Sequence, residues 1–204
     1  LFSKLLKALN NIGKKPIMAY GGYESIILCN TNSPARLYGV AQSVGYGEYR
    51  AITPVGGGMP VNKYYFLPTH CRMRFDDVAR ILSEHGYFSA SKSEKEHALD
   101  YYRDICNCGI CHEIIRDDIN GFSAYNDSIP YTVKTRNGIL TKNRPTTDAT
   151  LIAAIHFLNC KVFEWNYIEN EDLSTVLDNL KSCYAQYQPK FAGHINKWCE
   201  IYGK

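Results

Sequence analysis

The stretch Cys106-Asn107-Cys108-Gly109-Ile110-Cys111 decides how this chain is interpreted, because it brings three cysteines together within six residues. Gly109 lets the backbone turn sharply between the second and the third cysteine, so that three thiolates can converge on a single cation. This spacing predicts a metal site with Cys106, Cys108 and Cys111 as ligands, and zinc is the metal that such a thiolate cluster favours.

A tetrahedral zinc site needs a fourth ligand, and imidazole nitrogen and thiolate suit this ion about equally well. The candidates in the sequence are His112, His156 and Cys160. We favour His156, because an expected helix would present its side chain rigidly, whereas His112 adjoins Cys111 and would have to fold back over its own backbone. Four protein ligands leave no open position for water, so the zinc is expected to be structural.

Residues 108–112 also spell C-x-x-C-H, the motif at which a c-type haem is attached. Covalent haem attachment requires an exported chain, and the sequence opens with a lysine-containing amphipathic stretch instead of a signal peptide. The haem interpretation would also leave Cys106 as an unused thiol. Zinc is therefore the better interpretation.

The chain has 204 residues, of which 45% are hydrophobic and 21% charged, with a formal net charge of +3. This composition predicts a folded globular chain and excludes a disordered or polybasic one. No window approaches the roughly 18 apolar residues of a membrane helix, and most of the eight cysteines stand alone within apolar stretches. We expect a cytoplasmic protein without membrane association. Leu1 in place of an initiating methionine suggests that a segment is missing upstream.

The hydrophobic pattern predicts an α/β chain whose second half is mainly helical. Glycine-rich segments follow the first two expected strands, and a glycine-rich loop precedes the third, as in a repeated strand–helix arrangement. The stretch from Cys111 to Pro145 has no clear periodicity and is expected to be irregular. The expected strands are 17–20, 39–44 and 63–67, and the expected helices are 1–13, 75–82, 149–163 and 172–187.

The cysteine cluster followed by a histidine in a helix resembles the zinc module of tRNA-guanine transglycosylases. The sequence upstream of the cysteine cluster is similar to the divergent branch of that family that places 7-deazaguanine bases in DNA. The resemblance covers residues 16–185, and the cysteines are its most specific part. The upstream segments that carry it are 45–48, 56–60, 64–65, 68–70 and 74–77.

The resemblance implies a (β/α)₈ (TIM) barrel with the zinc module inserted near its C-terminal end. A complete barrel of this kind needs about 250 residues before insertions, which is more than this chain offers. We therefore expect the C-terminal portion of a barrel, with its last β/α units in residues 1–100 and the zinc-binding module with C-terminal helices in residues 101–204. The remaining strands would come from an upstream segment or from a separate chain.

The family's exchange reaction uses an aspartate nucleophile, and no such residue is found where it is expected, since residues 1–67 contain no aspartate. Chemistry at the anomeric carbon requires a carboxylate. Glu48 follows a glycine-rich strand end, where barrel enzymes hold their catalytic groups, and is the candidate. A solvated loop glutamate is the alternative, and the nucleophile would then lie in the absent part of the barrel.

Base binding is expected from Gly56, Gly57 and Gly58, whose backbone N–H groups can approach a base closely, and from Tyr46, whose ring can stack on it. A flexible turn before Pro60 explains the glycines about equally well. Nucleic-acid binding is expected from a basic loop between the cysteines and His156 and from a second group after a strand end. A solvated charged loop is the alternative. The basic residues are Lys134, Arg136, Lys142 and Arg144 in the loop, and His70, Arg72 and Arg74 in the second group.

Taken together, these patterns predict a transglycosylase-like zinc protein that exchanges guanine for a 7-deazaguanine base in DNA or tRNA, either alone or as one half of a split enzyme. The alternative is a non-catalytic zinc-containing subunit that binds nucleic acid or completes another chain. A stand-alone zinc-ribbon-like module is a third interpretation, which leaves the glycine-rich strand ends unexplained. A homo- or hetero-oligomer is expected under the first two.

Overall fold

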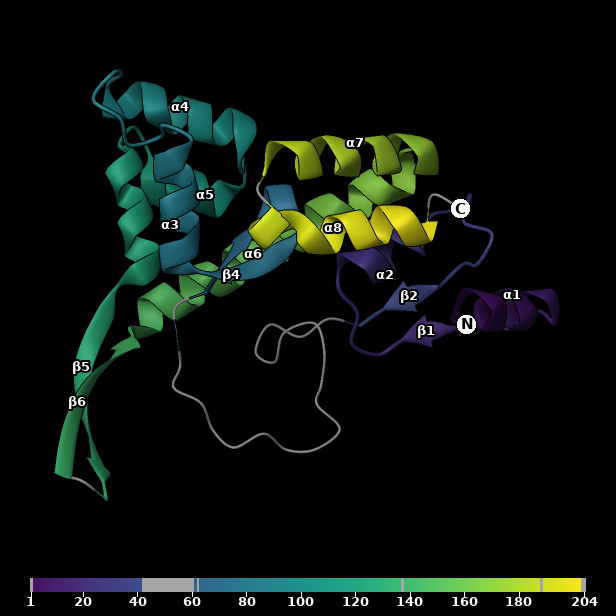
Figure 1. Ribbon diagram of the computed structural model, residues 1–204, viewed down its shortest axis with the longest axis horizontal. Coiled ribbons are helices and arrows are strands. Elements are labelled where there is room, and N and C mark those ends of the chain that lie inside the picture. Colours follow the sequence, from purple (N-terminus) through teal and green to yellow (C-terminus); the bar gives the residue numbers. More distant parts are fainter. Residues whose placement is uncertain (1, 42–60, 62, 137, 188, 203–204) are drawn as a thin grey trace. The chain divides into compact units, whose positions relative to one another are not determined.

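The structure is a computed structural model that describes residues 2–41, 61, 63–136, 138–187 and 189–202 (Figure 1). The chain divides into two compact units. Unit 1 comprises Leu1–Thr53, Pro68–Cys71 and Lys161–Lys204, and unit 2 comprises Pro54–Leu67 and Arg72–Cys160. The division between the units falls inside the longest helix, between Cys160 and Lys161.

The described elements are mostly helices with three two-stranded sheets. The strands are β1 (Ile17–Met18), β2 (Gly39–Val40), β3 (Lys63–Phe66), β4 (Cys71–Arg74), β5 (Ser128–Thr135) and β6 (Gly138–Pro145). The α-helices are α1 (Phe2–Asn11), α2 (Tyr23–Ile27), α3 (Phe75–Glu84), α4 (Glu94–Asp104), α5 (Gly109–Ile115), α6 (Thr147–Asn170), α7 (Leu173–Gln186) and α8 (Pro189–Tyr202). The 3₁₀ segments are η1 (Leu67–Thr69) and η2 (Ile119–Asn126).

Unit 1 contains a short parallel strand–helix–strand element. β1 pairs in parallel with β2, and α2 lies in the connection between them. A small apolar cluster supports this element and includes Leu6 of α1 together with Leu28, Ala35 and Leu37. The other described elements of unit 1 are mainly helices, with α7 packed on α8.

Asn30 joins this element to the last turn of α6 within unit 1. Its fully buried side chain donates hydrogen bonds through Nδ2 to the carbonyl oxygens of Ile168 at 2.7 Å and Glu171 at 2.8 Å. The last carbonyls of a helix have no partner inside the helix, so a buried amide that binds them stabilises the helix end.

Unit 2 is built around buried aromatic rings. Tyr64 of β3 packs edge-on against Phe122 and Tyr125 of η2, with ring centroids 5.1 and 5.0 Å apart. η2 approaches α5 so closely that a Cβ at Gly121 would lie 2.5 Å from the carbonyl oxygen of Ile114, which only glycine avoids. The aromatic cluster therefore depends on a position without a side chain.

Helix α4 begins with a capping box that its sequence encodes. Ser93 accepts a hydrogen bond from the backbone N–H of Glu96 at 3.3 Å, and the carboxylate of Glu96 accepts one from the backbone N–H of Ser93 at 2.9 Å. These bonds satisfy backbone donors at the helix start and fix where α4 begins. Its other end lies at Asp104, with Ile105 as the C-cap residue directly before Cys106.

The structure confirms a mixed α/β chain, mostly helical, and the expected helices near residues 75–82, 149–163 and 172–187 are present as α3, α6 and α7. The described residues form no barrel, because their strands pair only two by two. The expectation of an irregular stretch from Cys111 to Pro145 was wrong, since this stretch contains most of α5, η2 and an antiparallel hairpin of β5 and β6 with eight residues in each strand. The division of the chain at about residue 100 stays a prediction.

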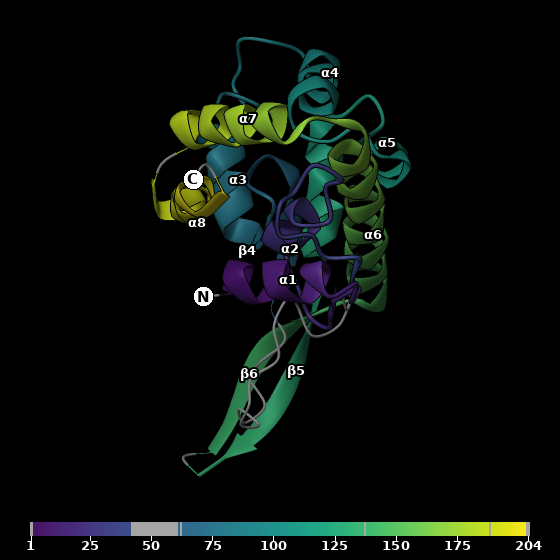
Figure 2. The same cartoon turned by 90° about the vertical axis from the view of Figure 1, so that its right-hand side faces the viewer.

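The β5–β6 hairpin extends away from the helices of unit 2 in both views (Figure 1 and Figure 2). Its first strand alternates Ile129, Tyr131 and Val133 with smaller or polar residues, which is typical of a strand. The second strand begins at Gly138, whose φ of 120° is unfavourable for other residues. Among the described residues, no helix combines the length and the apolar character needed to cross a bilayer.

Candidate metal centre

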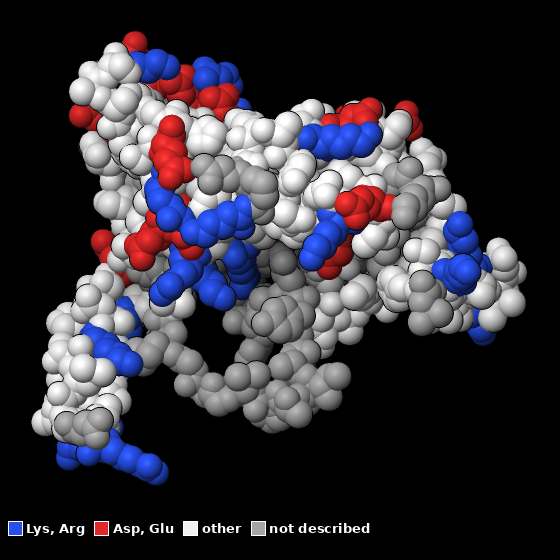
Figure 3. All heavy atoms as spheres, in the orientation of Figure 1, with Lys and Arg blue, Asp and Glu red and all other residues white. Residues whose placement is uncertain are grey.

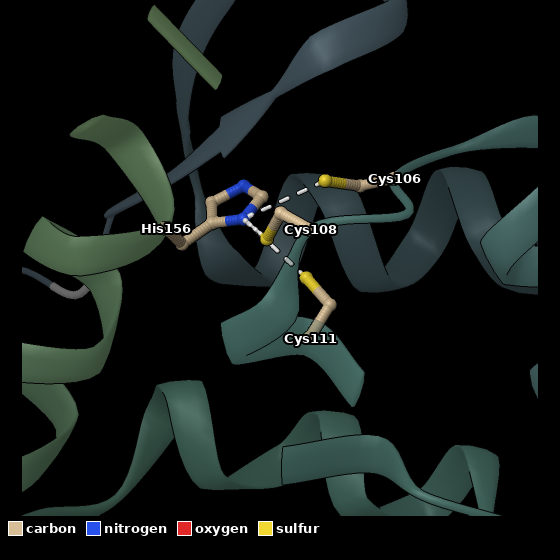
Figure 4. Close-up of side chains that lie close together, drawn as sticks. All are labelled: Cys106, Cys108, Cys111 and His156. Atoms are coloured by element: carbon tan, nitrogen blue, oxygen red, sulfur yellow. Dashed lines mark hydrogen bonds between the residues drawn. The ribbon is translucent and has the colours of Figure 1, made fainter. Parts of the chain in front are cut away.

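Three of the four predicted ligands come from one short segment at the α4–α5 junction (Figure 4). Cys106 follows the end of α4, Cys108 is the residue before α5, and Cys111 lies in the first turn of α5. Inside α6, His156 points its imidazole at the three sulfurs. The centre therefore ties two segments that are far apart in the sequence within unit 2.

The four side chains converge with the spacing of a tetrahedral metal site. Their ligand atoms all lie within 4.8 Å of one another. Nδ1 of His156 lies 3.4 Å from the sulfurs of Cys108 and Cys111 and 3.8 Å from that of Cys106. Zinc bonds of about 2.3 Å to sulfur and about 2.05 Å to nitrogen place these two atoms about 3.6 Å apart at the tetrahedral angle. The residues present fit a metal ion such as zinc.

His156 is held in the orientation that a metal ligand requires. Its Nε2 donates a hydrogen bond to the carbonyl oxygen of Tyr65 at 2.8 Å, which leaves Nδ1 facing the sulfurs. The ring also stacks on Tyr64, with centroids 4.2 Å apart and planes 18° from parallel. A backbone carbonyl that binds the second ring nitrogen is the usual way in which proteins select the tautomer of a ligating histidine.

The sulfur of Cys111 is surrounded by tyrosine hydroxyls. Those of Tyr101 and Tyr125 lie 3.4 Å from it and that of Tyr64 lies 3.7 Å from it. Burial raises the pKa of all three tyrosines far above the usual value, so their hydroxyls keep the proton that they can donate. Sequence reasoning missed this arrangement, because the three tyrosines come from β3, α4 and η2 and share no spacing.

Hydrogen bonding favours the thiolate form of Cys111. Burial by itself would raise the pKa of this thiol, but its contacts with Cys106, Cys108 and His156 bring the pKa well below the usual value. The same contacts with Cys108 and Cys111 overcome the burial of His156 and raise its pKa to about 10. These contacts stabilise the negative thiolate within a buried site, and such a site favours the binding of a cationic metal ion.

Neither of the two alternative fourth ligands belongs to the group of four ligand atoms that lie within 4.8 Å of one another. The ring of His112 stacks on Tyr102 at 3.9 Å and bonds to the side chain of Asn107. The buried sulfur of Cys160 lies 3.8 Å from that of Cys106, one helical turn beyond His156, at the edge of the centre. His156 is therefore the ligand that the geometry selects, as the sequence predicted.

The other predicted site residues have mixed outcomes. The catalytic candidate Glu48 and the base-binding candidates Tyr46, Gly56, Gly57 and Gly58 lie outside the described residues. The guanidinium of Arg72 lies 3.8 Å from the ring centroid of Phe157, so this side chain covers the core of unit 2. Arg74 is exposed at the residue before α3.

Lys134, Lys142 and Arg144 lie on the strands of the β5–β6 hairpin and not in a loop, which corrects the sequence-based expectation, and Arg136 lies in the turn between the strands. The hairpin is closed at its base by a hydrogen bond of 2.9 Å from the backbone N–H of Thr146 to the carbonyl oxygen of Asp127. The hairpin follows η2, which contains Tyr125, and leads into α6, the helix that carries His156.

Unit 1 contains a second buried group of ionisable side chains. Glu164 is almost fully buried and contacts Nδ1 of His70 at 2.7 Å and Nζ of Lys161 at 2.9 Å. His70 stacks on Tyr23 with ring centroids 3.6 Å apart, and its φ of 53° lies in the left-handed region. The sequence suggested His70 only as a possible nucleic-acid contact beside Arg72 and Arg74, and nothing in it indicated the partners that the structure gives this residue.

Comparison of the chain with models of known protein families, with curated proteins and with solved structures finds no match. The function of the chain is therefore inferred from its own side chains, and the Cys₃His group is the most specific indication among them.

Proposed function

We propose that Cys106, Cys108, Cys111 and His156 hold a structural zinc ion that stabilises unit 2. The observation that carries this proposal is the match between the nitrogen–sulfur distances of 3.4 to 3.8 Å and a tetrahedral zinc site. All four positions of such a site are filled by protein atoms, so the metal would hold the segment and would not activate water.

We further propose that the protein acts on nucleic acid as a transglycosylase-like enzyme. A carboxylate would attack the anomeric carbon and break its bond to N9 of guanine, which leaves with a proton. The nitrogen of an incoming 7-deazaguanine would then lose its proton, bond to the same carbon and release the carboxylate. The resemblance of the cysteine cluster and the helical histidine to tRNA-guanine transglycosylases supports this reaction. The parallel pair of β1 and β2 around α2 is compatible with one β/α unit of a barrel.

The reaction can be tested by incubating the zinc-loaded chain with a labelled 7-deazaguanine base and either duplex DNA or tRNA. We expect label to enter one of these polymers with release of an equal amount of guanine. Glu48→Gln should abolish incorporation if Glu48 supplies the carboxylate. Incorporation that survives this substitution would assign the nucleophile to another residue, and no incorporation into either polymer would contradict catalysis by this chain alone.

A second candidate function, a subunit that docks onto another chain, is favoured by one observation on α6. Leu151, Ile155 and Leu158 all lie in the part of α6 that belongs to unit 2, they are exposed, and they follow one another at spacings of four and three residues. This spacing forms one apolar stripe along a helix, as in helices that pair with another helix. We call these three residues the α6 apolar face. They support a partner chain or a second copy as the occupant.

A further inference from the structure

The β5–β6 hairpin projects from the helices of unit 2 and carries charge of one sign only. Residues 128–145 contain four lysines and arginines and no aspartate or glutamate. On the face of the molecule in Figure 3, blue and white atoms cover this hairpin and red atoms do not. Phosphate groups are the anions that such a surface neutralises when a protein binds nucleic acid.

We propose that this hairpin binds double-stranded DNA by lying in the major groove, with the face that carries Tyr131, Lys142 and Arg144 turned towards the DNA. The inference rests on the proposed function only in taking nucleic acid as the ligand. It adds that the β5–β6 hairpin makes the contact, that one defined face of the hairpin is used, and that the ligand is double-stranded DNA.

The strand register decides which side chains share a face. Tyr131 lies opposite Lys142, and Ile129 lies opposite Arg144. Directly paired residues of an antiparallel ladder point to the same side, and successive residues alternate. Lys134 is an odd number of residues from Tyr131 and therefore points to the other side. The contact face thus contains Ile129, Tyr131, Val133, Leu140, Lys142 and Arg144.

The two faces differ in character. On the contact face, Tyr131, Val133 and Lys142 are half-buried, and the guanidinium of Arg144 lies 6.0 Å from the centroid of the Tyr131 ring. An arginine over an aromatic ring is pre-ordered by the cation–π attraction and loses less freedom when it binds a phosphate or a base. The opposite face is mainly small and polar, and Lys134 is its single cation.

The dimensions of the hairpin match a groove of B-form DNA. Eight residues per strand extend about 26 Å at roughly 3.3 Å per residue. The major groove is about 12 Å wide and admits a two-stranded ribbon. The major groove of an RNA duplex is too deep and narrow for side chains to enter. Apolar contact of Tyr131 or Leu140 with thymine methyl groups would add to the charge contacts.

Two single substitutions on the same hairpin test the face assignment. Lys142→Gln removes a cation from the contact face, and Lys134→Gln removes the same charge from the opposite face. Binding is measured by fluorescence anisotropy with a labelled duplex DNA of about 20 base pairs over a range of salt concentrations. Zinc content and melting temperature of each variant show that the fold is retained.

We expect Lys142→Gln to weaken binding about fivefold and to reduce the slope of log affinity against log salt by about 0.9, the value for one phosphate contact. Lys134→Gln should leave the affinity within about twofold. A duplex with bulky substituents on pyrimidine C5, which project into the major groove, should bind more weakly than an unmodified one.

Equal effects of the two substitutions, no effect of Lys142→Gln, or tighter binding of single-stranded DNA or duplex RNA would overturn the inference. Unchanged binding of the C5-substituted duplex would overturn the groove assignment. If base exchange occurs while both variants bind DNA normally, only this inference fails. If the wild-type chain neither binds nucleic acid nor exchanges a base, the nucleic-acid part of the proposed function fails with it.

Discussion

Nε2 of His156 donates a hydrogen bond of 2.8 Å to the carbonyl oxygen of Tyr65, and this contact turns Nδ1 towards three cysteine sulfurs. The acceptor belongs to β3, whereas the sulfurs lie around α5. A strand therefore decides which ring nitrogen of a helical residue is available to a metal. The contact explains why His156, and not the equally buried Cys160 one turn later, completes the group.

Replacing His156 should remove the metal, and replacing Cys160 should not. We expect His156→Ala to lose the single zinc ion per chain and Cys160→Ala to keep it, as measured by metal analysis after dialysis. A structural zinc stabilises the folded chain, so its loss should also destabilise His156→Ala. A decrease of only about 3 kcal/mol in the free energy of unfolding would lower the melting temperature by roughly 6–12 °C. Zinc retained by His156→Ala but lost in Cys160→Ala would mean that the fourth ligand is misassigned.

The hydroxyl of Tyr101 should strengthen metal binding through Cys111. Tyr101→Phe removes a donor 3.4 Å from this sulfur, and such outer contacts contribute about 10–100-fold to metal affinity. Tyr102→Phe is a matched control, because its hydroxyl donates to the carbonyl oxygen of Arg116 at 2.6 Å. Competition with a chromogenic chelator measures both variants, and equal affinities would contradict a role for the Tyr101 hydroxyl.

The buried carboxylate of Glu164 should matter far more to stability than an exposed one in the same helical arrangement. Removing one member of a buried ion pair costs about 3–5 kcal/mol, so Glu164→Ala should lower the free energy of unfolding by that amount in urea titrations. Asp178→Ala is the control, because Asp178 and Lys181 form an exposed i,i+3 pair like Lys161 and Glu164. Exposed pairs contribute less than about 1 kcal/mol. Similar losses in both variants would show that Glu164 is not held as the structure describes.

A charge on the α6 apolar face should disrupt an assembly that uses this face. Leu158→Glu is expected to reduce the mass of the complex in multi-angle light scattering, because it places a carboxylate in an apolar contact. Leu99→Glu on α4 is a control of the same chemistry, since Leu99 is 55% exposed and Leu158 50%. A wild-type chain that is monomeric, alone and with co-expressed chains, would remove the basis of the subunit hypothesis.

The metal ligands could be predicted from the sequence because their chemistry is local. Cys106, Cys108 and Cys111 lie so close along the chain that any compact arrangement of this segment brings their sulfurs together. The helix around His156 was also predictable, because Thr146, Thr147 and Asp148 offer N-cap chemistry at its start. The contact of Glu164 with His70 could not be predicted, because the two residues lie 94 positions apart along the chain and no periodicity relates them.

Only part of the β5–β6 hairpin could be predicted from the sequence. Its charge and lack of acidic residues were evident, but residues 128–145 were expected to be a loop, since the apolar alternation of Ile129, Tyr131 and Val133 is short. Only the strand register separates Lys134 from Lys142 and gives the two lysines opposite faces. A register is a property of two paired segments, and a shift by one residue would exchange the faces.

The sequence by itself therefore determined the thiolate cluster, the helical histidine and the mainly helical second half of the chain. These features depend on spacings of a few residues, which local backbone geometry preserves in any fold. Only the tertiary structure decided which nitrogen of His156 faces the sulfurs, which tyrosines surround Cys111 and which cations share a face of the hairpin. Those relationships arise from packing between distant segments, where burial and hydrogen bonding select one arrangement among many that the sequence allows.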